Sequence, residues 1–291
     1  MKSVVVEDLC KSYGEVRALQ NISFEVKEGE IYGIIAPDGA GKTSLFRILT
    51  TLLLADSGSA TVCGCDVVRD YKKIRQICGY MPGRFSLYGD LSVKENLNFF
   101  ASLFNSTIEE NYHLVEDIYK QIEPFKNRRA DALSGGMKQK LALCCALIHR
   151  PEILFLDEPT TGVDPVSRAE FWDMLSRLKN EGITIIVSTP YMDEAARCSR
   201  IALMQSGRIL QEDTPQGIIN SCDKELYSVK GENMYSLLNT IREWQGTDSC
   251  YAFGESHHLT LKAGYDIDSL SIKAQISRIQ PTIEDCFMTL M

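Results

Sequence analysis

Short apolar runs alternate with amphipathic stretches over most of the chain. Runs of period two, or continuously apolar runs bounded by Gly, Pro or Asp, predict strands, whereas apolar positions repeating every three to four residues predict helices. The strand-like segments are residues 3–9, 22–26, 31–35, 60–62, 77–81, 153–156 and 184–188, and the helix-like segments are residues 43–49, 93–104, 112–122, 167–178 and 216–220. Strands interleaved with helices indicate an α/β core with a largely parallel sheet, into which a helical block at about 91–148 is inserted.

The last seventy or so residues have a different pattern. Short segments at 226–229, 235–244 and 258–261 predict a small α+β module without any motif that carries chemistry. We therefore expect two domains, residues 1–221 and residues 222–291.

Composition limits the class of protein. The 291 residues are 44% hydrophobic and carry a net charge of −8, and no apolar run reaches the length of a membrane span. An acidic balance argues against a nucleic-acid partner, which would favour a basic face. The start of the chain lacks the long apolar stretch of a secretory signal, so a soluble cytoplasmic protein is expected.

Cysteine and histidine spacing does not indicate a metal site. The pair Cys63 and Cys65 lies near a predicted strand end, Cys144 and Cys145 lie in an apolar helical run, and the remaining cysteines are scattered. Buried free thiols are the favoured interpretation. The histidines also show no ligand pattern; they are His113, His149, His257 and His258.

A phosphate-binding loop is the most informative motif. Between a predicted strand and a predicted helix the chain reads Ala36-Pro37-Asp38-Gly39-Ala40-Gly41-Lys42-Thr43, with Ala36 where a glycine usually stands. This arrangement points backbone N–H groups and a helix N-terminus at phosphate oxygens. Lys42 is expected to reach the β and γ phosphates of a nucleotide, and the Thr43 hydroxyl to bind Mg²⁺. A chance match of a short octet is the alternative.

Two further motifs follow in order. The apolar strand at 153–156 ends in Asp157 and Glu158, where Asp157 is expected to orient Mg²⁺ and Glu158 to polarise the attacking water. About twenty residues earlier the chain reads Leu133-Ser134-Gly135-Gly136. Ser134 is expected to cap a helix, and the two glycines permit close approach of a ligand. Taken alone, this motif also fits an ordinary capped helix.

Together these motifs, with Gly162-Val163-Asp164-Pro165, resemble those of the ATP-binding subunits of ABC transporters over roughly residues 1–221, and they are similar in detail to exporter and drug-efflux ATPases. The resemblance implies a phosphate-loop ATPase fold with an antiparallel N-terminal β part. It also implies two domains bound head to tail around two ATP molecules, with residues 84–90 meeting a membrane subunit. Glu158 would be catalytic, and Thr43 and Asp157 would hold Mg²⁺. The implied nucleotide-binding residues are Tyr13, which would stack on adenine, Ala36, Pro37, Asp38, Gly39, Ala40, Gly41, Lys42, Thr43, Ser44, Ser134, Gly135, Gly136 and Asp164.

Two positions depart from the family pattern. Gly83 stands where the family has a Gln that contacts Mg²⁺ and water, and Pro190 stands where it has a His that contacts the γ phosphate. Proline supplies neither an imidazole nor a backbone N–H. We therefore expect a subunit that binds MgATP but hydrolyses it slowly at its own loop, while its signature completes the site of a partner ATPase.

Several interpretations remain open at this point. The chain could be an ordinary homodimeric transport ATPase in which Glu158 suffices, a nucleotide-gated regulatory clamp with negligible turnover, or a non-transport ABC ATPase. The transport interpretation requires a second ATPase subunit, either the same chain or an intact partner, and a transmembrane permease. That permease would hold the chain at the inner face of the cell membrane.

Overall fold

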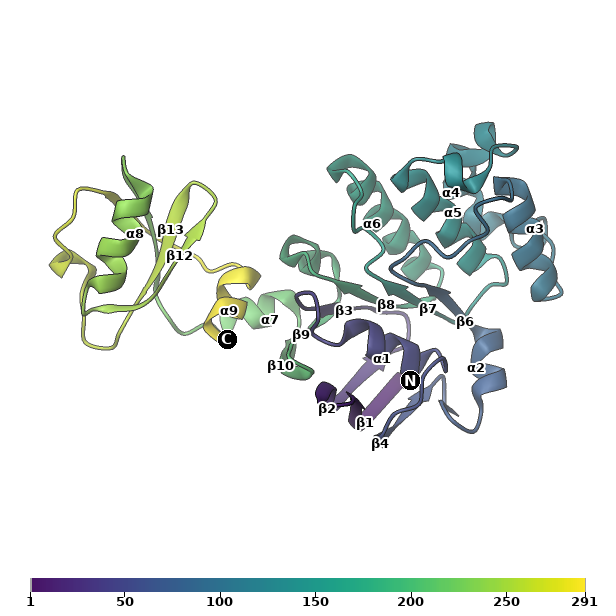
Figure 1. The fold of residues 1–291 in the computed structure, drawn as a ribbon, viewed down its shortest axis with the longest axis horizontal. Helices are drawn as coiled ribbons and strands as arrows, with labels where there is room; N and C mark the ends of the chain where they lie inside the picture. Colours follow the sequence, from purple (N-terminus) through teal and green to yellow (C-terminus); the bar gives the residue numbers. More distant parts are fainter. Residues whose placement is uncertain (1, 291) are drawn as a thin grey trace. The chain divides into compact units, whose positions relative to one another are not determined.

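The computed structural model describes residues 2–290, which form two compact units, one ending at Thr214 and one beginning at Pro215 (Figure 1). The helix α7 (Pro215–Asn220), which the sequence analysis placed in the first domain, belongs to the second unit. It does so because it packs against α9 (Ile283–Leu290), a contact between distant segments that no local pattern reveals.

A six-stranded sheet forms the centre of the first unit. Its order is β10-β9-β3-β8-β7-β6, with β10 antiparallel to β9 and the other pairs parallel. The bounds are β3 (Ile31–Ile35), β6 (Cys78–Met81), β7 (Ile153–Asp157), β8 (Thr184–Thr189), β9 (Arg200–Gln205) and β10 (Arg208–Asp213). The predicted largely parallel sheet is confirmed. Its strands β3 and β7 are buried along their whole length, as expected for a sheet covered on both faces.

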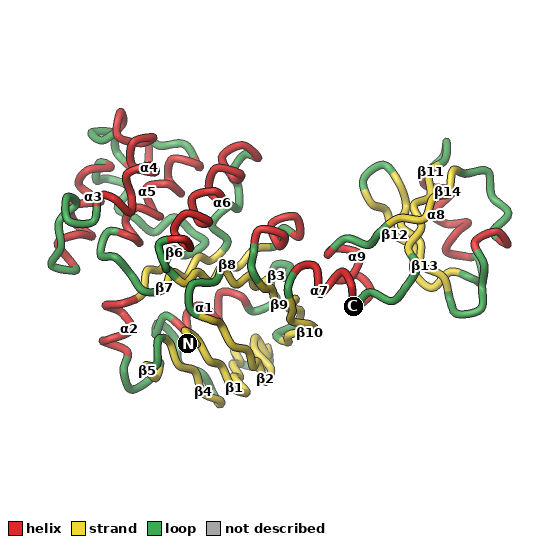
Figure 2. Tube along the Cα trace, turned by 180° about the vertical axis from the view of Figure 1, so that it is seen from behind, coloured by secondary structure: helices red, strands yellow, loops and turns green. Residues whose placement is uncertain are grey.

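An antiparallel sheet of order β2-β1-β4-β5 lies beside it, as the views of Figures 1 and 2 show. Its strands are β1 (Lys2–Tyr13), β2 (Val16–Lys27), β4 (Ser57–Val62) and β5 (Cys65–Asp66). The predicted antiparallel N-terminal part is thus confirmed, and its first two strands are longer than their apolar patterns indicated.

Helices cover the central sheet and form the inserted block. They are α1 (Lys42–Leu49), α2 (Tyr71–Ile77), α3 (Val93–Leu103), α4 (Tyr112–Ile122), α5 (Gly135–Leu147) and α6 (Pro165–Asn180), with short 3₁₀ helices at Glu123–Phe125, Ala130–Ala132 and Met192–Arg197. The block of α3, α4 and α5 lies between β6 and β7 in sequence, as predicted. Ser92 and Glu95 form a capping box that starts α3.

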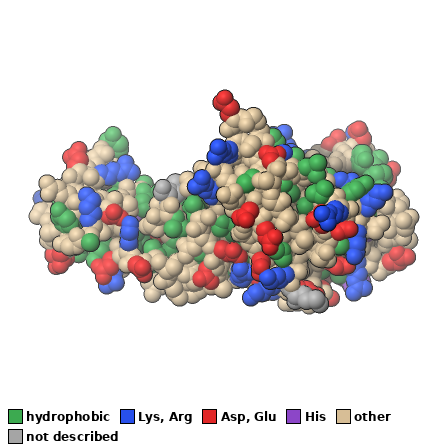
Figure 3. Space-filling model, turned by 90° about the horizontal axis from the view of Figure 1, so that it is seen from below, with side chains coloured by type: hydrophobic (Ala, Val, Ile, Leu, Met, Phe, Trp, Pro, Cys, Tyr) green, Lys and Arg blue, Asp and Glu red, His purple; other side chains and the backbone are tan. Residues whose placement is uncertain are grey.

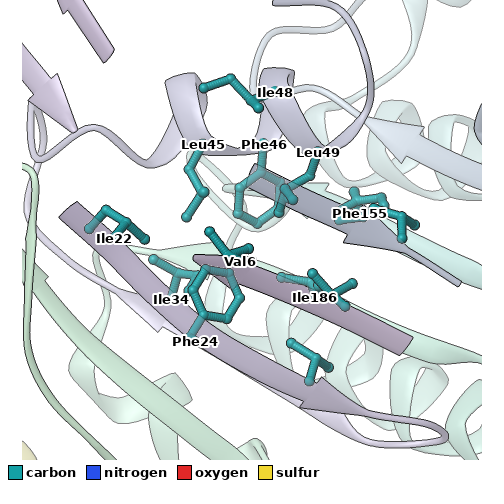
Figure 4. Packing of buried hydrophobic residues seen from close by; sticks show 14 of the residues in the cluster. Val6, Ile22, Phe24, Ile34, Leu45, Phe46, Ile48, Leu49, Phe155 and Ile186 are labelled. Atoms are coloured by element: carbon teal, nitrogen blue, oxygen red, sulfur yellow. The ribbon is translucent and has the colours of Figure 1, made fainter. Parts of the chain in front are cut away.

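The core of the first unit fills the space between the two sheets around α1 (Figure 4). Phe46 and Leu49 of α1 are fully buried there, together with Phe24 of β2 and Phe155 of β7. Burial of this apolar face fixes α1 between the sheets, and the N-terminus of α1 carries the phosphate loop with it.

The second unit is the predicted small α+β module. Its antiparallel sheet has the order β12-β13-β11-β14 and packs one face against α8. The bounds are β11 (Leu226–Lys230), α8 (Met234–Glu243), β12 (Thr247–Phe253), β13 (Ser256–Leu261) and β14 (Gln275–Ile279), with a 3₁₀ helix at Ile267–Ser269. His258 Nδ1 lies 2.5 Å from Asp285 Oδ1 and so ties β13 to α9.

All ten cysteines are free thiols, seven of them buried, which agrees with their predicted role as packing residues. Among residues 2–290 no group of His, Cys, Asp and Glu side chains has the arrangement of a metal centre. Within the same range no helix is long and apolar enough to cross a membrane. On the face drawn in Figure 3, acidic and basic side chains are interspersed, and neither sign dominates that face.

Candidate nucleotide-binding site

The loop 36–41 joins β3 to α1 in a conformation that requires glycine. Gly39 has φ 78° and Gly41 has φ 104°, both in the left-handed region. A Cβ on Gly41 would lie 2.2 Å from the carbonyl oxygen of Ala18, so no other residue fits there. No side chain caps α1, which leaves its first N–H groups available to an anion.

Ala36 replaces a glycine without strain. Its φ is negative, since it is absent from the positive-φ positions of the described chain, and its methyl group is buried in the core between the sheets. Its N–H donates to the carbonyl of Thr189 at 3.2 Å. The departure at Ala36 therefore leaves the backbone of the loop intact.

Lys42 is a buried cation inside this loop, with 4% of its side chain exposed. Its Nζ donates to the carbonyls of Ala36 at 2.8 Å and Pro37 at 3.0 Å, and it lies 3.0 Å from Glu158 Oε1. A phosphate group entering the loop would compete with Glu158 for this ammonium group. The expected lysine and the expected catalytic carboxylate thus meet in one place.

The acid pair lies at the carboxyl end of β7. Asp157 is 2% exposed and pairs in register with Ser188 of β8, whose Oγ donates to Asp157 Oδ1 at 2.7 Å. Glu158 has φ 51°, and its N–H donates to both the carbonyl and the Oγ of Ser188 at 3.0 Å. Burial, followed by the negative charge of Asp157, raises the pKa of nearby Tyr80 to about 12.

The sequence analysis did not identify Ser188. The available signal was weak: a polar residue near the end of an otherwise apolar strand, two positions before Pro190. Its contact with the acid pair depends on the register between β7 and β8, which the local pattern does not specify.

Tyr13 lies at the end of β1, beside the first turn of α1. Its hydroxyl is 3.2 Å from Ser44 Oγ, and 47% of the residue is exposed. The Lys11 ammonium lies 5.8 Å from the centroid of the ring. The predicted adenine-stacking residue is therefore next to the phosphate loop with a partly exposed ring, while Thr43 is exposed at the start of α1.

The signature residues form a second group. Ser134 caps α5 by accepting from the Met137 N–H at 3.4 Å. A Cβ on Gly135 would lie 3.5 Å from the Gly162 carbonyl, and one on Gly136 would lie 3.1 Å from Ser167 Oγ. The signature turn thus packs on the loop that leads into α6.

Asp164 belongs to this second group and caps α6. It accepts from the N–H groups of Ser167 at 3.0 Å and Val166 at 3.1 Å. The hydrogen bonds from Ser167 lower the pKa of the exposed Asp164 carboxyl. The expected site residues therefore fall into two sets: the loop with Tyr13 and the acid pair, and the signature with Asp164.

Of the two substituted positions, Gly83 lies against the acid pair, and Pro190 follows the strand next to it. A Cβ on Gly83 would be 3.0 Å from the Asp157 carbonyl oxygen and 3.8 Å from Glu158 Cβ. Pro190 follows directly after β8. The segment after it is held by Glu194, which is 3% exposed and accepts from Thr189 Oγ1 at 2.6 Å.

The chain is similar to known ATP-binding proteins. A family model described as "ABC transporter" matches residues 19–161. The chain is 39% identical over 217 residues to the probable multidrug ABC transporter ATP-binding protein YbhF of Escherichia coli, a match that covers 74% of this chain but only 38% of that protein. It is 38% identical to the daunorubicin resistance ATP-binding protein DrrA2 of Streptomyces coeruleorubidus, covering 75% of this chain and 69% of the relative.

Solved structures of ABC transporter ATP-binding proteins have a similar fold. The cbiO1 protein of Clostridium perfringens, part of the ABC transporter complex cbiONQ, is 28% identical with a TM-score of 0.67, and the match covers 76% of this chain and 91% of that one. A dimeric ATP-binding cassette in a post-hydrolysis state, bound to ADP and Pi, is 26% identical with a TM-score of 0.66, and the match covers 72% of this chain and 98% of that one.

Proposed function

Because the chain belongs to the ABC transporter family, we propose that it is the ATP-binding subunit of an exporter, with ATP bound at its phosphate loop. The observation that carries the proposal is the buried Lys42 ammonium, 3.0 Å from Glu158 and enclosed by the carbonyls of the loop. Such a site offers one cation for the γ phosphate of a nucleotide and one candidate general base beside it, which supports the proposal. Several relatives are named as resistance or export ATP-binding proteins, which supports export.

The residues fit a magnesium ion. Mg²⁺ prefers oxygen donors, and the Thr43 hydroxyl and the Asp157 carboxylate supply them. Oδ1 of Asp157 is held by Ser188, and among residues 2–290 no hydrogen bond occupies Oδ2. When bound, Mg²⁺ would neutralise charge on the phosphates. Lys42 would hold the terminal phosphate, and Glu158 would accept a proton from the attacking water.

The two sets of site residues support a head-to-tail dimer. Ser134, Gly135, Gly136 and Asp164 lie together on the α5–α6 side, whereas the phosphate loop contacts Glu158 and Thr189. In a dimer, the signature of one subunit would cover the nucleotide held by the loop of the other. The second subunit is either the same chain or another ATPase.

We further propose slow hydrolysis at the chain's own loop. Removing one positioned donor from a transition state costs about 100- to 1,000-fold in rate, and both Gly83 and Pro190 lack such a donor. Lys42, Tyr13 and the loop backbone are retained, so nucleotide affinity should be largely kept.

An apolar groove in the first unit is the proposed docking surface for a membrane permease. It measures about 470 Å³ and lies among α2, α3, α5 and the segment after β6. Its apolar walls include Leu52, Leu87, Phe100, Leu103 and Phe104. Leu52 and Leu103 are 56% and 61% exposed, and residues 86–87 belong to the segment expected to meet the membrane subunit. The permease would hold the chain at the inner face of the membrane.

The experiment measures MgATP hydrolysis and ATP affinity for the purified chain and for Gly83→Gln/Pro190→His. A side chain at position 83 must displace its neighbours, because its Cβ would be 3.0 Å from the Asp157 carbonyl. Gly83→Ala is therefore the control for that displacement. Pro190→His alone measures the effect of the histidine without any change at position 83. If the native chain hydrolyses ATP as fast as the best restored variant, the slow-turnover proposal is wrong and an ordinary homodimeric motor follows. Tight ATP binding with no turnover in any variant would favour a nucleotide-gated regulatory clamp.

A further inference from the structure

Ser188 links the two acidic residues of the site to the neighbouring strand. We propose that Ser188 is a positioning residue whose hydroxyl orients Asp157 for Mg²⁺ and holds Glu158 in its left-handed backbone conformation. This proposal rests on the proposed function, because it assigns a role within the same nucleotide site.

The hydrogen bonds leave the Ser188 hydroxyl a single orientation. Its oxygen accepts from the Glu158 N–H at 3.0 Å, so its proton points to Asp157 Oδ1, 2.7 Å away. Ser188 is fully buried, so water does not compete for either bond. Asp157 therefore keeps one oxygen in the bond to Ser188 and turns the other away from it.

The backbone of Glu158 depends on the same residue. A φ of 51° is unfavourable for a residue with a side chain, and it persists only where neighbouring contacts impose it. Both the carbonyl and the hydroxyl of Ser188 accept from the Glu158 N–H. This conformation turns the chain at the end of β7 and directs the Glu158 carboxylate to Lys42.

Ser188 contributes more to orienting Asp157 in this chain than it would in a chain with Gln at position 83 and His at position 190. Gly83 and Pro190 supply no side-chain donor, and among residues 2–290 Ser188 is the one residue whose side chain hydrogen-bonds Asp157. Packing alone does not require a hydroxyl, since the preceding residues of β8, Ile186 and Val187, are fully buried and apolar. Groups that orient a metal ligand typically change metal affinity or activity by about 10- to 100-fold when removed.

The test measures the Mg²⁺ dependence of nucleotide binding without turnover. A fluorescent non-hydrolysable ATP analogue is titrated at increasing Mg²⁺ concentration and, separately, in EDTA. Ser188→Ala should need about 10- to 100-fold more Mg²⁺ for half of the metal-dependent gain in affinity, with affinity in EDTA within about two-fold of the native chain. The pair Ser188→Thr and Ser188→Val has nearly equal shape and differs in the hydroxyl, so Thr should retain the Mg²⁺ response and Val should lose it.

Thr184→Val is the matched control on the same strand. Thr184 is 1% exposed, and its hydroxyl bonds Ser3 and the Gly29 N–H at the opposite end of β8. This variant should lose stability but keep the native Mg²⁺ response. An unchanged Mg²⁺ response in Ser188→Ala, or equal responses in the Thr and Val variants, would overturn the role of Ser188 alone. A native chain that binds no nucleotide would overturn the proposed function as well.

Discussion

Glu194 offers the sharpest test of how the segment after β8 is held. Its carboxylate is 3% exposed, accepts hydrogen bonds from the hydroxyls of Thr160 at 2.8 Å and Thr189 at 2.6 Å, and forms an ion pair of 3.2 Å with Arg168 Nε. These partners come from the loop after β7, from β8 and from α6. One buried carboxylate thus joins the acid-pair loop, the Pro190 segment and the helix capped by Asp164.

Glu194→Ala should strongly destabilise the first unit. The change leaves two buried hydroxyls without an acceptor and removes the buried partner of Arg168, which is 20% exposed and keeps Asp193 at 2.9 Å. Leaving a buried hydroxyl without its partner costs about 1–3 kcal/mol, so the two hydroxyls together cost about 2–6 kcal/mol. For a unit of this size, each kcal/mol lowers Tm by about 2–4 °C, so a fall of about 4–24 °C is expected.

Glu170→Ala is the matched control. Glu170 forms an ion pair of 2.7 Å with Lys140, but its side chain is 47% exposed, and exposed pairs are worth about 0–1 kcal/mol. Unfolding of the first unit is followed by fluorescence of Trp172, which is buried in α6, in a Trp244→Phe background that removes the tryptophan of the second unit. Equal destabilisation by Glu194→Ala and Glu170→Ala would refute the reasoning.

Four further outcomes are expected. Lys42→Met should weaken ATP binding by about 100-fold, since charged hydrogen bonds contribute about 1.5–3 kcal/mol, and unchanged affinity in a calorimetric titration would exclude Lys42 from the site. Tyr13→Ala should weaken ATP binding about ten-fold while Tyr13→Phe keeps it, if the ring stacks on adenine; equal losses would point to the hydroxyl instead. Leu103→Glu should abolish co-purification with a permease and leave ATP affinity unchanged, whereas retained co-purification would remove the groove as the docking surface. Burial raises the pKa of Asp285, but hydrogen bonds from His258, Thr282 and Tyr251 outweigh burial and lower that pKa. The second unit should therefore lose stability as pH falls from about 4 towards the lowered pKa. Asp285→Asn should make the stability of this unit less dependent on pH in acid denaturation.

Much of the fold follows from local patterns. The buried strands β3, β7 and β8 each contain a short apolar run, and α4 spans the predicted 112–122 without change. The structure also contains elements that the patterns did not indicate, namely α2, β5, β9, β10, β12, β14 and α9. Several of these are short or partly exposed, so their apolar periodicity is weak and their pairing partners stabilise them.

The candidate site divides in the same way. The phosphate loop, the acid pair and the signature are contiguous motifs, because glycines at positive φ, a lysine at a helix start and a capping serine act within a few residues of one another. Ser188 and Glu194 were not found from the sequence. Ser188 reaches Asp157, 31 positions away, through the register of β7 and β8. Glu194 reaches Thr160, 34 positions away, from the 3₁₀ helix after β8.

The order of residues therefore specified which chemical groups the protein has and which short segments present them. Tertiary packing decided how those groups meet. The parallel pairing of β7 with β8 placed a serine against the acid pair, and close approach of the segment after β6 placed Gly83 on Asp157. Contact between α7 and α9 assigned α7 to the second unit. Hydrogen bonds and burial act over a few ångströms in space, and residues distant in sequence come within that range only when the sheets and helices pack.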